Sequence, residues 1–296
     1  MRKKFLPIVF ILILSGAIIG TRVFKVYSQS LSTSDLVMSQ QTKKKATPAK
    51  LQTKESEDVT MQVRQQRLTK VKAERRPFKL PSEAHLNVPL IKQLPELPRG
   101  CEVTSLAMLL NYAGYSVSKE TLAKQVKKDP TPYKKTNGHV HFGNPNHGFV
   151  GAMDTFDKPG LGVYHGPIAE LAERYMGERV IDLTGKSFST VLKQLAEGAP
   201  VWIINNTLFT KLSDTYWEKW STPEGPIEIT YKEHSVLVTG YDNQWIYFND
   251  PLAGKKDRRI KRASFIEGWK QMGSQAISYD VTDAAQLVNN TVRPAP

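Results

Sequence analysis

Cysteine is nearly absent from the sequence. Cys101 is the single cysteine among 296 residues, so the chain forms no internal disulfide bond. No cysteine lies near the end of the N-terminal apolar stretch, which excludes a lipid-modified cysteine there. The sequence contains no internal repeat. The fold must therefore come from an ordinary apolar core, and the one thiol has to be explained by itself.

Net charge is nearly absent from residues 81–296, although the whole chain has a formal charge of +13. This region holds 24 Lys and Arg against 23 Asp and Glu, whereas residues 1–80 hold 17 against 5. The basic surplus therefore belongs to the N-terminal segment. The larger part of the chain lacks the positive charge of a nucleic-acid-binding domain, and we expect no nucleic-acid partner.

The N-terminus has the pattern of a targeting segment. Three basic residues follow Met1, and residues 5–20 carry no charge, which predicts a signal peptide or membrane anchor over residues 1–27 and not a helix of a soluble core. No Ala-x-Ala cleavage site follows. We therefore favour an uncleaved single-pass anchor in the cell membrane with the domain outside the cell. The protein is secreted instead if the segment is cleaved.

Residues 28–78 are rich in Ser, Thr, Gln and Lys and lack a sustained apolar period. They predict a basic disordered tether, which either lies on an anionic membrane surface or cell wall or is a solvated linker only. Residues 283–296 predict a polar C-terminal tail. Between these segments, residues 79–282 are long enough for one domain with a sizeable core.

The sequence of this domain predicts helices in its first half and antiparallel strands in its second half. This order is typical of an α+β fold. The apolar spacing indicates helices at 101–113, 119–127, 167–176 and 187–197. Alternating or continuous apolar runs indicate strands at 200–205, 227–231, 235–241 and 245–249.

Cys101 lies where a proline-marked loop becomes a helix. Pro95 and Pro98 exclude helix before Arg99, and Gly114 provides a C-terminal stop. The free N–H groups at a helix N-terminus favour a thiolate, the nucleophilic form of cysteine. The alternative is a small buried apolar side chain. Export favours the catalytic interpretation, because a lone thiol in an oxidising space is a liability unless it is used.

A cysteine nucleophile needs a base and a group that orients the base. His234 opens a strong strand, and a hairpin folded about Asn243 makes Asp250 its diagonal neighbour on the same face. Taken alone, His234 could be a core histidine and Asp250 an ordinary strand end. The chain order Cys101, His234, Asp250 suits the papain-like arrangement. Gln93 is placed to donate to an oxyanion beside the Cys101 N–H.

A loop dense in Gly, Asn and His precedes the second half of the domain. It contains His139, His141 and His147, but no acid or cysteine stands at zinc-site spacing, so we expect no metal and no cofactor. Loops of this length are often functional. We predict that the loop either forms a wall on the substrate side or is structural. The candidate substrate-binding residues in it are Asn144, Asn146, Gly148 and Phe149.

Four motifs resemble the peptidase C-39-like proteins, papain-fold relatives of the bacteriocin-leader peptidases. They are Val88-Pro89-Leu90-Ile91-Lys92-Gln93, Gly100-Cys101-Glu102-x-Thr104-Ser105-Leu106-Ala107-Met108, Glu233-His234-Ser235-Val236-Leu237-Val238-Thr239-Gly240-Tyr241-Asp242 and Asn249-Asp250-Pro251. The loop at 143–151 is similar to that of the stand-alone exported branch found in Gram-positive bacteria.

The resemblance implies a papain-like cysteine peptidase with Cys101 as nucleophile, His234 as general base, Asp250 as its orienting group and Gln93 as oxyanion donor. The leader peptidases belong to transporter chains, whereas this sequence has no G-x-x-x-x-G-K-[ST] motif. A double-glycine substrate is therefore not assumed.

Three functions remain open. The first is a surface-anchored thiol peptidase that hydrolyses peptide or protein substrates. The second is an endopeptidase or amidase for peptidoglycan stem peptides, and the third is a non-catalytic binding module with the same groove. For the catalytic functions we predict a low pKa for Cys101, because the helix N-terminus and His234 both favour the thiolate.

Overall fold

The structure is a computed structural model that describes residues 79–281. The predicted anchor, the predicted tether and residues 282–296, which include the predicted C-terminal tail, lie outside the described residues. Within residues 79–281, none of the helices has the length and apolarity needed to cross a bilayer. The described residues lie within the predicted domain at 79–282.

Five α-helices of the described region have the bounds α2 (Cys101–Tyr112), α3 (Lys119–Gln125), α4 (His165–Met176), α5 (Phe188–Ala196) and α6 (Arg262–Gln271). Helix α2 is buried along nearly its whole length, since each residue from 101 to 110 is buried. It ends before Gly114, whose φ of +93° is a conformation that favours glycine. The predicted stop is confirmed.

The main sheet has seven strands and is antiparallel throughout. Its order is β12 (Lys255–Lys261), β11 (Trp245–Asp250), β10 (Glu233–Tyr241), β7 (Val201–Asn206), β13 (Ala276–Tyr279) and β6 (Val180–Asp182), and β1 (Ala84–His85) also pairs with β10. Strands β7 and β10 are buried on both faces, which explains their apolar runs at 201–204 and 236–238.

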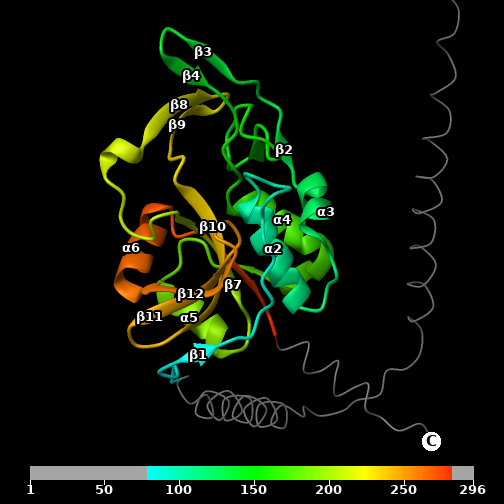
Figure 1. The fold of residues 1–296 in the computed structure, drawn as a ribbon, viewed down its shortest axis with the longest axis vertical. Helices are drawn as coiled ribbons and strands as arrows, with labels where there is room; N and C mark the ends of the chain where they lie inside the picture. Colours follow the sequence, from blue (N-terminus) through cyan, green and yellow to red (C-terminus); the bar gives the residue numbers. More distant parts are fainter. Residues whose placement is uncertain (1–78, 282–296) are drawn as a thin grey trace, which may run out of the picture. The chain divides into compact units, whose positions relative to one another are not determined.

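Two apolar cores cover the two faces of this sheet. Helices α2 and α4 pack on one face, where Leu237 belongs to the core. Helices α5 and α6 pack on the other face, where Val236 and Val238 belong to the second core. Figure 1 shows α2, α3 and α4 on one side of β10 and β7, with α5 and α6 on the other. Alternate residues of β10 therefore serve different cores.

A smaller sheet lies at one end of the domain, at the top of Figure 1. It has the order β3 (Lys134–Thr136), β4 (His139–His141), β8 (Glu218–Thr222) and β9 (Gly225–Ile229). A third core with Phe142 and Trp220 lies beneath it. A separate parallel pair joins β2 (Lys128–Asp129) to β5 (Phe149–Val150). Two 3-10 turns, at Gly177–Arg179 and Asp214–Tyr216, complete the elements.

The α+β class is confirmed, and the helices and strands predicted from periodicity are present within a few residues of their predicted ends. The segregation is less complete than expected. Helix α6 lies among the late strands, and several short strands lie among the early helices. These elements were missed because two- to four-residue strands carry no period and because Arg262–Gln271 carries few apolar residues.

Candidate active site

Cys101 is the first residue of α2 and is 7% exposed. The preceding residue must be glycine, because a Cβ on Gly100 would lie 2.6 Å from Cβ of Leu97. Thr104 Oγ1 donates to the Gly100 carbonyl at 2.7 Å and secures this turn. The loop therefore enters α2 tightly and holds the thiol at the helix N-terminus.

The thiol faces carboxyl groups. Cys101 Sγ donates to Glu102 Oε2 at 3.3 Å, and Glu233 lies close by, since one ligand atom from each of the three residues lies within 4.8 Å of the others. Burial and these two carboxylates raise the pKa of the Cys101 thiol well above its ordinary value, although a hydrogen bond from the Ser235 backbone opposes the shift. The low pKa predicted from the sequence is wrong for this arrangement. The helix terminus and His234 do not outweigh burial and two acids.

His234 and Asp250 are in contact, as the hairpin predicted. Strand β10 pairs with β11 so that Leu237 lies opposite Asn249, a register that brings Asp250 diagonally beside His234. His234 Nε2 lies 3.0 Å from Asp250 Oδ1, and both side chains are 2% exposed. Because Nε2 faces the carboxylate, Nδ1 is the ring nitrogen left to exchange a proton with a substrate or thiol.

Asp250 is held in place by further donors. Its Oδ1 accepts from the N–H groups of Leu252 and Ala253, and its Oδ2 lies 2.6 Å from Arg258 Nη1. Burial opposes ionisation, but the hydrogen bond and charge of His234 and the other donors outweigh it and hold the pKa of Asp250 well below its usual value. Asp250 is therefore a fixed anion beside the imidazole.

Gln93 sits on a loop anchored from two sides. Its backbone N–H donates to the Pro251 carbonyl at 3.0 Å, and the buried Lys119 ammonium donates to the carbonyls of Lys92 and Gln93 at 2.6 and 2.9 Å. The Gln93 side-chain Nε2 donates to the Pro98 carbonyl at 2.8 Å. An amide has two N–H bonds, so one remains for a second acceptor.

Gln93, Cys101 and His234 line one cavity of about 330 Å³. Its wall also contains Glu233, and its rim carries the exposed side chains of Phe156, Tyr231 and Leu252. A larger cavity of about 610 Å³ opens beside Trp245, Lys261 and Arg262. That second cavity has no thiol, histidine or carboxylate in its lining, so we assign the chemistry to the first.

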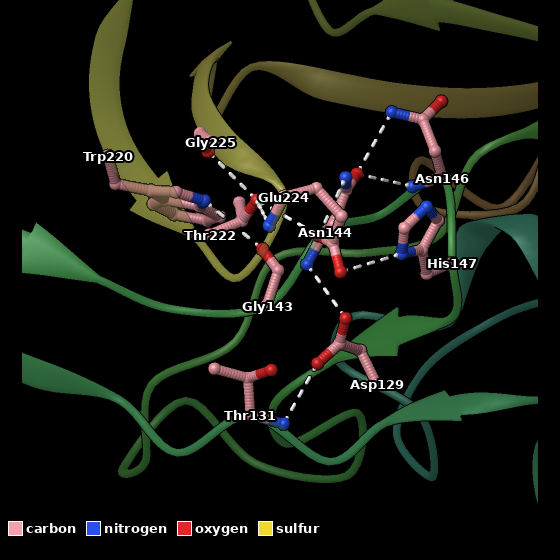
Figure 2. Close-up of polar contacts among 10 residues, drawn as sticks. All are labelled: Asp129, Thr131, Gly143, Asn144, Asn146, His147, Trp220, Thr222, Glu224 and Gly225. Atoms are coloured by element: carbon pink, nitrogen blue, oxygen red, sulfur yellow. Dashed lines mark hydrogen bonds and ion pairs between the residues drawn. The ribbon is translucent and has the colours of Figure 1, made fainter.

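The four loop residues predicted to bind substrate do not line the cavity of Cys101. Asn144 is held by its own loop and by two other segments: its Oδ1 accepts from Asn146, its Nδ2 donates to Glu224, and its N–H donates to Asp129 (Figure 2). Gly148 packs against the backbone of residues 127–129, and Phe149 is fully buried in the core. The structure thus gives these residues contacts that hold the loop, and their binding of substrate stays a prediction.

Figure 2 also shows what fastens this loop to the smaller sheet. Trp220 Nε1 donates to the Gly143 carbonyl at 3.1 Å, and His147 Nδ1 lies 3.3 Å from Glu224 Oε1. His139 and His141 lie in β4. Among residues 79–281, the groups of three or more potential metal ligands include none of these histidines. The three therefore belong to the loop and sheet and not to the cavity.

Comparisons with known proteins identify the family. A sequence model of the Peptidase_C39 like family matches residues 85–277, which is most of the described domain. The chain belongs to this family. It is 55% identical over 194 residues to YvpB, an uncharacterized protein of Bacillus subtilis strain 168, over 65% of this chain and 74% of that protein. It is also similar to a crystal structure from Bacillus anthracis described provisionally as a C39-like peptidase, with 47% identity and a TM-score of 0.63 over 68% of this chain and 98% of the other.

Sequence reasoning missed four residues that shape the site. Glu102 and Glu233 face the thiol, Arg258 holds Asp250, and Lys119 anchors the Gln93 loop. The two glutamates had a signal: each is an acid directly beside a candidate catalytic residue in an otherwise apolar element. Lys119 had none, because its partners are distant in sequence. Arg258 lies only eight residues from Asp250, but it belongs to a strand with several basic residues, and nothing marked it among them.

Proposed function

We propose that this C39-like protein is a cysteine peptidase that hydrolyses peptide bonds. The observation that carries the proposal is the shared cavity, into which Cys101, His234 and Gln93 project from three separate elements. The contact between His234 and the fixed anion Asp250 supports it. This set supplies a nucleophile, a base, an orienting anion and an oxyanion donor.

The proposed reaction uses these four residues. His234 Nδ1 takes the thiol proton, and Cys101 Sγ attacks the carbonyl carbon of the scissile bond. The remaining Gln93 N–H and the Cys101 backbone N–H stabilise the oxyanion. Asp250 stabilises the imidazolium, which then gives its proton to the leaving amine as the C–N bond breaks. Water activated by His234 adds to the thioester, breaks the C–S bond and releases the carboxylic acid, while the proton returns to sulfur.

The cavity rim supports a peptide substrate with bulky apolar side chains near the scissile bond. Phe156 is 65% exposed and Tyr231 54% exposed, although both are large apolar or aromatic side chains. Arg99 holds Phe156 in place, with its guanidinium carbon 4.8 Å from the ring centre. Exposed apolar groups that gather at one cleft mark a binding surface, because each is stabilised when a partner covers it.

The test measures the rate at which the full chain hydrolyses peptide bonds. Unlinked peptides with and without apolar residues are offered alongside purified peptidoglycan, with Cys101→Ala as the matched control. Cleavage of peptides by the wild type alone supports the proposal. Cleavage of peptidoglycan stem peptides only would instead assign the cell-wall alternative. Turnover by Cys101→Ala would contradict both.

One observation favours the non-catalytic alternative. The thiol donates to Glu102, and its pKa is raised, so at neutral pH it is protonated in this arrangement. A binding module would show no turnover of any peptide and would retain peptide binding in Cys101→Ala.

We propose further that residues 5–20 anchor the chain with its domain outside the cell and that the basic segment 28–78 lies on an anionic surface. Protease accessibility on intact cells tests this location.

A further inference from the structure

Two buried carboxyl groups meet behind the nucleophile. Glu102 follows Cys101 on α2 and has no exposed surface, and Glu233 precedes His234 on β10 and is 9% exposed. A Cβ on Gly162 would lie 2.2 Å from Glu102 Oε1 and 2.8 Å from Glu233 Oε2. The two carboxyl groups therefore adjoin the same point, and only glycine leaves room for them.

The surroundings do not neutralise two negative charges. Glu102 Oε1 accepts from the Val163 N–H at 2.7 Å and Oε2 accepts from the thiol. Glu233 Oε1 is buried without a hydrogen-bond partner among the described residues. A buried carboxylate without a partner is costly, whereas a protonated carboxyl can lie beside a carboxylate. The geometry thus calls for one proton on the pair.

We propose that Glu102 and Glu233 share one proton as a buried carboxyl pair, and that this pair acts as a positioning element that sets the ionisation of Cys101. The proposal rests on the proposed function only in assigning a use to the thiol. While the pair keeps its proton, Cys101 faces one negative charge. Once the proton is lost, Cys101 faces two, and the thiolate becomes harder to form.

The charges around the pair agree with this assignment. Burial raises the pKa of Glu102 to about 7, and burial and Glu102 raise that of Glu233 well above its usual value. From β2, the Lys128 ammonium attracts Glu102, but Lys128 is an exposed residue, so solvent screens its charge. From the segment before α4, the Tyr164 phenol stays neutral, since burial and both glutamates raise its pKa well above its usual value. Cys101 also faces the pair, and Arg99, Tyr231 and His234 line the same cavity as Glu233.

The experiment measures the alkylation rate of Cys101 by iodoacetamide against pH in the full chain. The variants are Glu102→Gln and Glu233→Gln, which keep the shape of each side chain. Asp182→Asn is the matched control, because Asp182 is bound to His165 at 2.7 Å outside this cavity. Because the wild-type thiol ionises only after the pair has lost its proton, it faces two negative charges, whereas either glutamate variant leaves one. We therefore expect the midpoint of the rate to fall by about one to three pH units in both variants, the usual effect of removing a nearby like charge. The control should not change.

A second readout detects the shared proton itself. In Cys101→Ala at neutral pH, infrared spectroscopy should show the C=O stretch of a protonated carboxylic acid, and Cys101→Ala combined with Glu233→Gln should lose it. Circular dichroism verifies that each variant folds. If Glu102→Gln does not fold, the infrared band is the measurement that tests the shared proton. An absent band, or an alkylation midpoint that Glu233→Gln leaves unchanged, would overturn the proposal. Neither readout needs a substrate, so a protein without peptidase activity would not be confused with a failed pair.

Discussion

Replacement of Asp250 by asparagine isolates the charge that orients the base. Asp250 accepts hydrogen bonds from His234 and from two backbone N–H groups, and it pairs with Arg258. An asparagine Oδ1 keeps an acceptor for the ring and the turn, but the negative charge is lost. Alanine would remove every contact and leave Arg258 and His234 unpaired, at a cost of about 3–5 kcal/mol. Since folded domains are stable by about 5–15 kcal/mol, Asp250→Ala confuses folding with catalysis.

The expected loss follows from the imidazolium. A hydrogen bond to a charged group contributes about 1.5–3 kcal/mol, and each 1.36 kcal/mol is tenfold in rate. Asp250→Asn should therefore lower kcat by about 10- to 150-fold while the chain stays folded. The assay is peptide hydrolysis by the full chain, with Asp182→Asn as the control for loss of a His–Asp pair elsewhere. Equal activity in the two variants, or a loss that only follows the unfolded fraction, would refute the reasoning.

The same variant has a signature in the pH dependence of stability. The folded-state pKa of Asp250 is depressed, so its contribution is fully present above the unfolded value of about 3.9 and is lost as the pH falls through the lower folded value. The stability difference between wild type and Asp250→Asn should be full at pH 7 and should narrow in acid below pH 4. Urea denaturation at several pH values measures it. A stability difference between wild type and Asp250→Asn that stays constant as the pH falls well below 4 would show that the charge of Asp250 does not contribute to stability.

Three further predictions concern other parts of the chain. Gln93→Ala should lower kcat by about 10²-fold or more with little change in KM, because its free N–H bonds mainly to the developing charge; a raised KM alone would place it in substrate binding. His234→Ala should abolish turnover without unfolding the domain, whereas His147→Ala should retain it, and equal loss in both would mean that the base is wrongly assigned. A chain that begins at Lys79 should fold cooperatively and cleave a small peptide as fast as the full chain; loss of the melting transition would show that the removed segment is needed for folding.

The local parts of the site were predictable from the sequence. The start of α2 at Cys101 follows from prolines before it and an apolar helical face after it. The contact between His234 and Asp250 follows from one hairpin, because the period of a strand is two and the turn fixes the register. Both inferences use only neighbours in the chain, where propensity and periodicity act directly.

The electrostatics of the thiol were predictable only in part. Glu102 is adjacent to Cys101 in the chain, whereas Glu233 reaches the thiol only through contacts between distant segments. Residue 102 meets residue 233 only after α2 packs on β10, and the Gly162 segment closes over both. The helix-terminus argument considered Cys101 without these neighbours. The contacts of the long loop were not predictable for the same reason: Asn144 bonds to Asp129 and Glu224, which lie 15 and 80 residues away in the chain.

The central claim is that Cys101 attacks the peptide bond, and trapping the thioester tests it most directly. The full chain is mixed with a cleavable peptide, quenched in acid within one turnover and examined by mass spectrometry. The account predicts a mass increase equal to the acyl half of the peptide, located on Cys101, which does not form in His234→Ala. Peptide cleavage at an undiminished rate by Cys101→Ala, with no adduct on the wild type, would contradict it.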